Sequence, residues 1–349
     1  MCIRDRLYLY LREQVEVQAE EQASHEQTPG LWPLNKHRKG EFIFLAPGHP
    51  LNLPPAPGLT DELNPYRGLK SYDRQHAPLF FGREDEIKEL TALVDQQSFL
   101  AVLGASGTGK SSLVKAGVLP RLQVERGRLK VEGAPEAAKR SDAFSRPAPA
   151  EATEDATTNA AYRVPPPMRP TDQPVKALAA LLRAVPDFRS LGDFGSPDGG
   201  DDALAQAIAR WAEGHPNERL VLTVDQFEEL ATLCRDDAER ERFLRLLAAV
   251  VEQQPAAFRL IITLRTDFEP QFTQTGSPLA QLWQVGRYIV PPMDIEDLRQ
   301  VIEGPASVRV LYFDPPELVD DLIKEVIQTP GALPLLSFTL SELYVKYVR

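Results

Sequence analysis

GASGTGKSS, residues 104–112, is the most informative run of this 349-residue chain. It satisfies every fixed position of the pattern G-x-x-x-x-G-K-[ST], in which a glycine-rich loop wraps a polyphosphate. The apolar run FLAVL at 99–103 precedes it with the length of a buried strand, and apolar residues at near-helical spacing follow it over 113–118. A strand, a loop and a helix in this order are the context that the pattern requires.

The residue types of this loop suit a polyphosphate ligand. Glycines let backbone N–H groups point inward, where a side chain would block the approach. The helix that begins near Lys110 adds its positive end. We expect the Lys110 ammonium to reach the β- and γ-phosphates and the Ser111 hydroxyl to join the shell of a Mg²⁺ ion. The alternative is a glycine-rich turn with a chance lysine. The predicted nucleotide-binding residues of the loop are Gly104, Ser106, Gly107, Thr108, Gly109, Lys110, Ser111 and Ser112.

Composition narrows the class of protein. With 43% hydrophobic residues the chain can form a globular core, and its length exceeds the usual size of one domain. A net charge of −11 argues against broad binding to nucleic acid or to an anionic membrane. The two cysteines are far apart and lack metal-ligand spacing. No apolar run is long enough to cross a bilayer. We therefore expect a cytoplasmic protein without nucleic-acid or membrane partners.

Apolar strand-like runs alternate with amphipathic helix-like runs after the loop. The clearest strands are 220–224 and 260–264, and helical periodicity covers 202–213 and 237–252. Strands separated by helices predict a parallel sheet that is covered on both faces, an α/β fold. From Asp294 onward only helices are expected, and Asp294 can cap the first of them. In such sheets ligands gather at the carboxyl ends of the strands.

Acidic residues follow the strand at 220–224. Asp225 stands directly after it, where a carboxylate can hold Mg²⁺, usually through water. Glu228 or Glu229 would orient or deprotonate the attacking water, and the sequence does not choose between them. The alternative for all of these carboxylates is an acidic helix start, because carboxylates favour helix N-termini.

An arginine follows the strand at 260–264. Arg265 is in position to sense the γ-phosphate or to stabilise charge during phosphoryl transfer. The alternative is a surface ion pair between Arg265 and Asp267. The five histidines are scattered through loops without ligand spacing, so we expect them at the surface.

Over about 64–349 the chain resembles the STAND signal-transduction NTPases, in particular the bacterial branch that is often fused to caspase-like domains and WD-type propellers. The resemblance implies a three-layer, AAA-like P-loop NTPase with a C-terminal helical lid. It also implies that Phe81, Gly82 and Arg83 lie against the adenine, that Pro334 touches the base and that Arg265 is the arginine of the first sensor. The motifs that carry the resemblance are NPYRGL at 64–69, FFGRE at 80–84, DQFEE at 225–229, VPPM at 290–293, GPA at 304–306 and GALPLL at 331–336.

The chain also departs from this pattern. Many relatives in the wider class have Glu directly after the metal-binding Asp, whereas this chain has Gln226. The family normally continues into a winged-helix domain, and the chain stops before it. The first residues resemble the end of a caspase-like domain, and Cys2 is not a candidate nucleophile. The predicted domains are a caspase-like remnant at 1–47, a proline-rich linker at 48–63, an NTPase core at 64–290 with a low-complexity insertion at about 124–161, and a helical lid at 291–349.

Together these observations predict a nucleotide-driven switch. ATP with Mg²⁺ would favour an open, self-associating state and ADP a closed state, and slow hydrolysis would reset the switch. The resemblance implies that the switch controls a fused protease-like effector and is followed by a WD-propeller. The alternatives are a nucleotide-dependent scaffold with negligible hydrolysis, a small-molecule phosphotransferase and, with less support, a DNA-loading ATPase.

Overall fold

The computed structural model describes residues 59–124, 161–191, 194, 199–274, 276–309, 311–329 and 331–348. The chain divides into two compact units, and the described residues all belong to the unit that combines Leu59–Leu129 with Thr157–Arg349. The predicted caspase-like remnant, most of the predicted linker and almost all of the predicted insertion lie outside the described residues.

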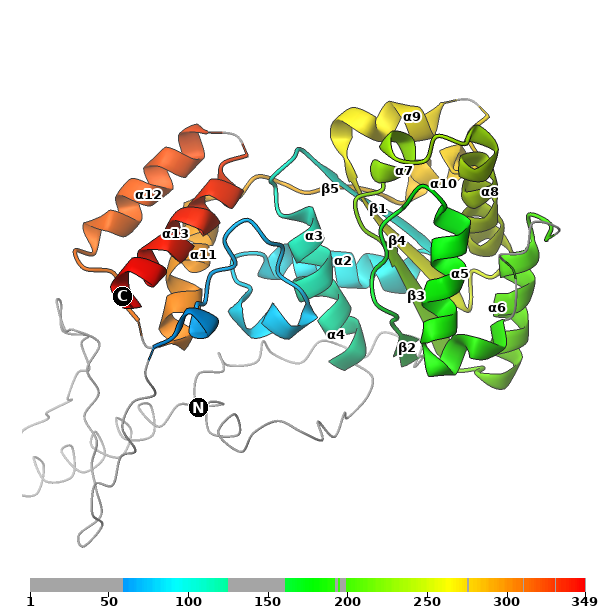
Figure 1. Ribbon diagram of the computed structural model, residues 1–349, viewed down its shortest axis with the longest axis horizontal. Helices are drawn as coiled ribbons and strands as arrows, with labels where there is room; N and C mark the ends of the chain where they lie inside the picture. The colour runs from blue at the N-terminus through cyan, green and yellow to red at the C-terminus, as the bar shows by residue number, and fades with distance from the viewer. Residues whose placement is uncertain are drawn as a thin grey trace, which may run out of the picture. The chain divides into compact units, whose positions relative to one another are not determined.

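A five-stranded parallel sheet lies at the centre of this unit, in the order β2-β3-β4-β1-β5 (Figure 1). Almost every residue of β1, β3 and β4 is buried, as expected for strands that are covered on both faces. The predicted α/β fold with a parallel sheet is therefore confirmed. The strands are β1 (Phe99–Gly104), β2 (Ala161–Arg163), β3 (Glu218–Val224), β4 (Phe258–Arg265) and β5 (Arg287–Ile289).

The register of the sheet brings the expected functional positions to one edge. Gly104 at the end of β1 lies opposite Arg265 at the end of β4. Val224 at the end of β3 lies opposite Ile262. Because β1, β3 and β4 run in parallel, the residues that follow them emerge at the same carboxyl edge.

One face of the sheet packs against α5 (Pro174–Ala184), α6 (Ala203–Gly214) and α8 (Asp237–Gln253). Their apolar stripes form a large cluster with the side chains of β1, β3 and β4, and Figure 1 shows these helices on the same side of the sheet. Burial of this continuous apolar surface is the main stabilising contribution to the core.

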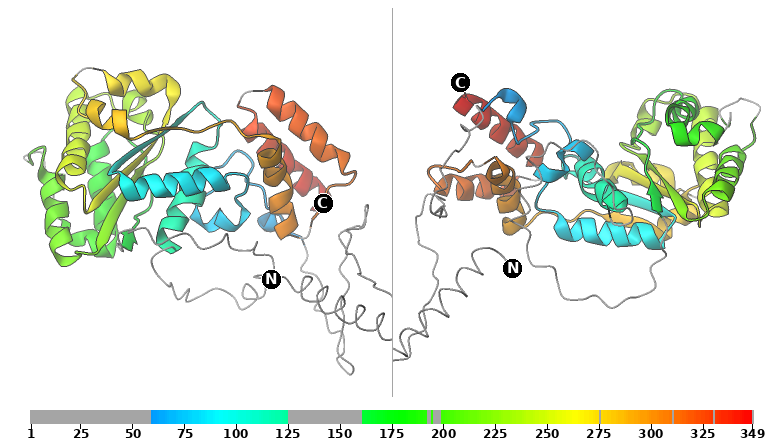
Figure 2. Two further views of the ribbon diagram at one scale, coloured as in Figure 1. Left: turned by 180° about the vertical axis from the view of Figure 1, so that it is seen from behind. Right: turned by 90° about the horizontal axis from the view of Figure 1, so that it is seen from below.

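The other face packs against α2 (Glu84–Gln96) and the helical run that follows the phosphate loop. This run consists of α3 (Lys110–Ser112), a π-helical stretch η3 (Leu113–Val118) and α4 (Leu119–Val124). Residues of the run and of α2 form a second apolar cluster against the sheet (Figure 2). The phosphate loop is therefore held between a buried strand and a buried helix. The remaining short elements of the core are η1 (Asp61–Leu63), η2 (Arg74–Leu79), η6 (Pro186–Leu191), α7 (Glu229–Thr232), η7 (Thr266–Phe268), α9 (Glu269–Thr273) and α10 (Ala280–Val285).

Helices α11 (Ile295–Val308), α12 (Glu317–Gln328) and α13 (Leu333–Val348) follow the last strand. They surround an apolar cluster of their own. Asp294 caps α11, because its side chain accepts a hydrogen bond from the backbone N–H of Asp297 at 2.8 Å. None of the helices in the described residues combines the length and the apolar character needed to cross a bilayer.

The N-terminal strap, residues 59–83, touches both the C-terminal helices and the helix after the phosphate loop. The buried hydroxyl of Tyr66 donates to the carbonyl of Ile302 in α11. A few residues later, the backbone N–H of Tyr72 donates to the Ser112 hydroxyl at 3.0 Å. The strap thus links two parts of the structure that are far apart in the sequence.

Candidate functional site

The phosphate loop has the backbone conformation that its glycines predict. Gly107 and Gly109 have φ angles of +80° and +86°, in the left-handed region that favours glycine. The Lys110 ammonium donates to the carbonyls of Gly104 at 2.8 Å and Ala105 at 2.7 Å. Burial lowers the pKa of Lys110, and the nearby Arg265 acts in the same direction. The Lys110 side chain therefore folds back over the loop. A short rotation of this side chain would bring the ammonium to a ligand in the loop.

Asp225 is buried at the carboxyl end of β3, with 2% of its surface exposed. Its Oδ1 accepts hydrogen bonds from the hydroxyls of Ser111 at 2.6 Å and Thr263 at 2.7 Å. Thr263 in turn accepts from the backbone N–H of Gln226 at 2.9 Å. The structure thus brings together Ser111 and Asp225, the predicted metal ligands.

The second oxygen of Asp225 has different surroundings. Oδ2 is buried and forms no hydrogen bond with the described residues. The Lys115 ammonium lies 3.4 Å from it, and Nε of Arg169 lies 3.7 Å away. A carboxylate oxygen without a hydrogen bond, close to a serine hydroxyl, is the donor chemistry that Mg²⁺ prefers. These residues therefore fit a Mg²⁺ ion that completes its shell with water and phosphate, although the described residues contain no group of three or more His, Cys, Asp or Glu side chains arranged around a metal.

The candidate bases Glu228 and Glu229 differ in placement. Glu228 lines the pocket that contains the phosphate loop, and its Oε2 accepts from the backbone N–H of Arg265 at 3.3 Å. Glu229 begins α7 and is not among the residues that line the pocket. Burial raises the pKa of Glu229. Geometry therefore favours Glu228 as the group that faces a bound ligand.

Arg265 forms the ion pair that was the alternative to a phosphate-binding role, and it also lines the pocket. Its guanidinium forms a bidentate pair with Asp267, at 3.1 and 2.7 Å, and lies 5.3 Å from the centre of the Phe268 ring. The same residue lines the pocket of the phosphate loop. The surface ion pair is thus present, and its position leaves the guanidinium at the pocket rim.

The pocket has a volume of about 670 Å³, enough for a nucleotide, and is formed by the phosphate loop, the N-terminal strap and the C-terminal helices. The predicted site residues that line it are Phe81, Ser106, Gly107, Gly109, Lys110, Ser111, Ser112, Glu228, Arg265 and Pro334. Those that do not line it are Gly82, Arg83, Gly104, Thr108, Asp225 and Glu229.

The three residues expected against the adenine have different surroundings. Phe81 faces the pocket, and a side-chain carbon added to Gly304 of α11 would lie 2.5 Å from its ring. Gly82 has φ of +76°, and an added carbon there would lie 2.5 Å from the carbonyl oxygen of Asp297. Arg83 is 2% exposed and pairs with Glu86. Gly82 thus lies directly against α11 and Arg83 pairs locally with a residue of α2, while Phe81 borders the pocket.

Sequence reasoning missed Thr263, Lys115 and Arg169, all of which contact Asp225. Thr263 is the polar residue within the apolar run LIITL at 260–264, which is a usable signal. Lys115 lies four positions after Ser111, so a helix places both on one face. Arg169 follows an irregular segment after β2, and no periodic pattern marks it.

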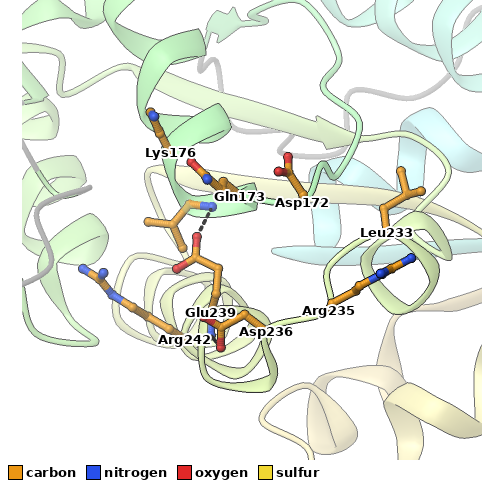
Figure 3. A pocket seen from close by; sticks show the side chains of 9 residues that line it. Asp172, Gln173, Lys176, Leu233, Arg235, Asp236, Glu239 and Arg242 are labelled. Carbon is orange, nitrogen blue, oxygen red and sulfur yellow. Dashed lines mark hydrogen bonds between the residues drawn. The ribbon is translucent and has the colours of Figure 1, made fainter.

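A separate pocket of about 620 Å³ lies beside α5 and α8 and shares no residue with the first (Figure 3). Glu239 of α8 points toward α5 and accepts from the backbone N–H of Val175 at 3.2 Å. Charges of both signs surround this pocket, including Lys176 and Asp236. None of the predicted site residues lines it.

The family comparison matches most of the chain. A protein-family model described as nSTAND1, Novel STAND NTPase 1, matches residues 65–349. Comparison with curated protein sequences gave no match.

Solved structures to which the chain is similar include one protein of Pyrococcus abyssi and two of Aeropyrum pernix. The Walker-type ATPase PABY2304 of Pyrococcus abyssi is 16% identical, with 80% of this chain and 74% of that chain covered and a TM-score of 0.46. The ORC2 protein of Aeropyrum pernix, solved as ADPNP–ADP complexes, is 13% identical, with coverage of 76% and 68% and a TM-score of 0.48. The ORC1 protein of Aeropyrum pernix in complex with DNA is 16% identical, with coverage of 77% and 61% and a TM-score of 0.45.

Proposed function

The chain belongs to the novel STAND NTPase 1 family, and from its site we propose an ATP-binding, slowly hydrolysing switch module. As a member of this family it is a nucleotide-binding NTPase. The proposal goes beyond family membership in three respects. The nucleotide is ATP, the cofactor is Mg²⁺, and the module controls an effector.

The observation that carries the proposal is the convergence of Lys110, Ser111 and Asp225 beside one pocket. Lys110 and Ser111 come from the loop after β1, and Asp225 comes from the end of β3. The hydrogen bond of 2.6 Å between Ser111 and Asp225 closes this arrangement. A polyphosphate bound by the loop would meet a cation from Lys110 and oxygen ligands for a metal at the same point.

Ser111 and Asp225 are the residues that would hold Mg²⁺. The ion would supply positive charge that stabilises the transferring phosphoryl group. Glu228 would orient the attacking water from the pocket wall, and Arg265 would stabilise charge on the γ-phosphate after leaving Asp267. Phe81 and Pro334 would border the base.

The proposed switch uses the C-terminal helices as the moving part. Val301 and Pro305 of α11 and Ser337 of α13 line the same pocket as the phosphate loop. A ligand in that pocket therefore contacts both parts and biases their relative position. We propose that ADP favours the closed arrangement, that ATP favours an open and self-associating one, and that a cytoplasmic, protease-like effector reads the difference.

A nucleotide-dependent scaffold with negligible hydrolysis is the second candidate. Gln226 supports it, because it stands where many relatives of the wider class have Glu. Its φ of +56° lies in the left-handed region, which is uncommon for a residue other than glycine. In that case the switch would be reset by nucleotide exchange instead of hydrolysis.

Calorimetry and phosphate release test the proposal together. ATP and GTP are titrated into the purified chain with and without MgCl₂, and phosphate release is then followed in water without an acceptor. We expect ATP to bind more tightly with Mg²⁺ and to be hydrolysed slowly. Absence of heat with either nucleotide and Mg²⁺ would overturn the proposal. Binding without phosphate release would favour the scaffold, and release that requires an added acceptor would favour a phosphotransferase.

A further inference from the structure

Asp225 presents its oxygens to different partners. Oδ1 accepts hydrogen bonds from Ser111 and Thr263. Oδ2 is the oxygen that remains for a cation, and it is faced by the side chains of Lys115 at 3.4 Å and Arg169 at 3.7 Å. Lys115 is well shielded, with 12% of its side chain exposed, whereas 52% of the Arg169 side chain is exposed. Lys115 is therefore the better-fixed charge beside Oδ2.

These positive charges affect the binding of a metal ion directly. A divalent cation at Oδ2 would be repelled by the Lys115 ammonium and the Arg169 guanidinium in a partly buried site, where screening by water is weak. A polyphosphate in the loop changes this balance, because it brings several negative charges and supplies oxygen ligands to the same ion. Mg²⁺ in proteins is typically held by one or two carboxylates together with substrate phosphates.

Lys115 also has partners on the N-terminal strap. Its ammonium donates to the Ser71 hydroxyl at 2.7 Å and lies 3.2 Å from Oδ1 of Asp73. When a cation approaches Asp225, Lys115 keeps these partners and is not left as a buried, unpaired charge. The strap therefore supplies partners that still hold the ammonium when its contact with Asp225 is lost.

We propose that Lys115, assisted by Arg169, makes the divalent-cation site conditional on a bound polyphosphate. Lys115 neutralises Asp225 until phosphate oxygens arrive, and it then gives up this contact while it keeps those with Ser71 and Asp73. It acts through Asp225 and is a positioning residue. This inference rests on the proposed nucleotide-binding function, and it names the order in which that site takes its ligands.

The test measures the metal dependence of ATP affinity. The Kd for ATP is determined by calorimetry in MgCl₂ and in EDTA, and the ratio of the EDTA value to the Mg²⁺ value is compared between variants. Lys115→Met is expected to raise this ratio about tenfold. Metal-free ATP loses the attraction of a nearby cation, whereas Mg²⁺ binds an Asp225 whose charge is no longer neutralised by the ammonium. Lys115→Arg keeps the charge and is expected to leave the ratio within about twofold of the wild type.

A variant on the strap is expected to change the ratio in the opposite direction. Asp73→Asn weakens the alternative partner of Lys115, so the ammonium stays nearer Asp225 and the ratio falls about threefold. Asparagine keeps the capping ability of Asp73 at the start of η2. Arg121→Met, which removes an exposed cation from α4 in the same helical run, is the control and should leave the ratio unchanged.

A second measurement needs no nucleotide. Binding of Mn²⁺ alone, followed by electron paramagnetic resonance, should be at least about tenfold tighter in Lys115→Met than in the wild type. If the variant binds Mn²⁺ no better and its ATP ratio is unchanged or lower, the inference is overturned. A purely structural role would weaken ATP equally in Mg²⁺ and EDTA and leave the ratio constant. A wild type that binds no ATP overturns the proposed function instead, while the Mn²⁺ measurement still decides the inference.

Discussion

Gly107 of the phosphate loop and Pro334 of α13 approach each other closely. A side-chain carbon placed on Gly107 would lie 3.2 Å from the ring of Pro334 and 2.9 Å from the carbonyl oxygen of Gly331. The φ of Gly107 is +80°, so any other residue would also be strained there. The phosphate loop and the C-terminal helices are therefore in direct contact at the wall of the pocket.

Gly107→Ala is expected to weaken ATP binding at least about tenfold and to lower the free energy of unfolding by about 1–3 kcal/mol, because strain and crowding act together. Gly109→Ala is the matched control, since Gly109 has φ of +86° but no atom of the described residues lies within 4 Å of an added carbon. Gly109→Ala therefore introduces the backbone strain without the contact with Gly331 and Pro334. Calorimetry and chemical unfolding check both variants, and equal effects on stability would show that the contact with Gly331 and Pro334 contributes nothing.

Lys110→Ala is expected to reduce ATP affinity about 100-fold while the chain remains folded. The side chain supplies the cation for the phosphates, while the fold loses only its hydrogen bonds to Gly104 and Ala105. Lys88→Ala, on the exposed side of α2, is the control and should bind ATP as the wild type does. Calorimetry gives the affinities and circular dichroism reports the fold. Unchanged affinity in Lys110→Ala would contradict the assignment of the phosphate loop.

Glu228→Gln is expected to reduce the rate of phosphate release by about 100-fold or more, because Glu228 lines the pocket and is placed to act on water. Its ATP affinity should change little. Glu229→Gln should retain turnover within about fivefold of the wild type, since Glu229 does not line the pocket. Single-turnover assays separate binding from chemistry, and the reverse order of effects would assign the base to Glu229.

The stability of the core is expected to depend on pH through Glu269. Arg287 hydrogen-bonds to this carboxylate and lowers its pKa, and Nε1 of Trp283 also donates to it at 3.0 Å. A lowered pKa adds stability that is present above the unfolded value, about pH 4.3, and is lost as pH falls through the folded value. The Glu269 side chain is 14% exposed but that of Arg287 is 43% exposed, so the contribution is about 1 kcal/mol after screening.

Glu269→Gln should therefore be less stable than the wild type at pH 7, and the difference should shrink below about pH 4. Urea unfolding at both pH values measures the two free energies. Glu252→Gln on the exposed surface of α8 is the control and should not change stability at either pH. A Glu269→Gln deficit that stays constant with pH would mean that packing around Trp283, instead of the charge pair, is responsible.

The main features of the site follow from local sequence together with the parallel arrangement of strands. Asp225 follows one apolar run and Arg265 follows another, so a parallel sheet brings both to the edge that holds the phosphate loop. The close approach of Ser111 to Asp225 is a direct consequence of this geometry. Local patterns were sufficient here because each residue stands next to the element that positions it.

Other parts of the site depend on long-range packing. Lys115 meets Asp73, 42 positions earlier in the sequence, only because the strap lies across the helix after the phosphate loop. Gly82 lies so close to α11 that an added side-chain carbon would be 2.5 Å from the carbonyl oxygen of Asp297, because α11 packs against the strap. Such contacts depend on how separate elements pack against each other. No periodic pattern in the sequence of the strap predicts them.

The double attachment of the strap limits how far the C-terminal helices can swing. About six residues separate the Tyr66 hydroxyl contact with Ile302 from the Tyr72 contact with Ser112, so that length of chain spans at most about 20 Å. Any wider excursion must first break one attachment. Tyr66 is 6% exposed and its bond is fully buried, whereas the bond between Tyr72 and Ser112 is only partly buried. The bond between Tyr72 and Ser112, at the end of the phosphate loop, is therefore the attachment expected to break first. A ligand that holds Ser112 in place would restrict the movement of the strap further.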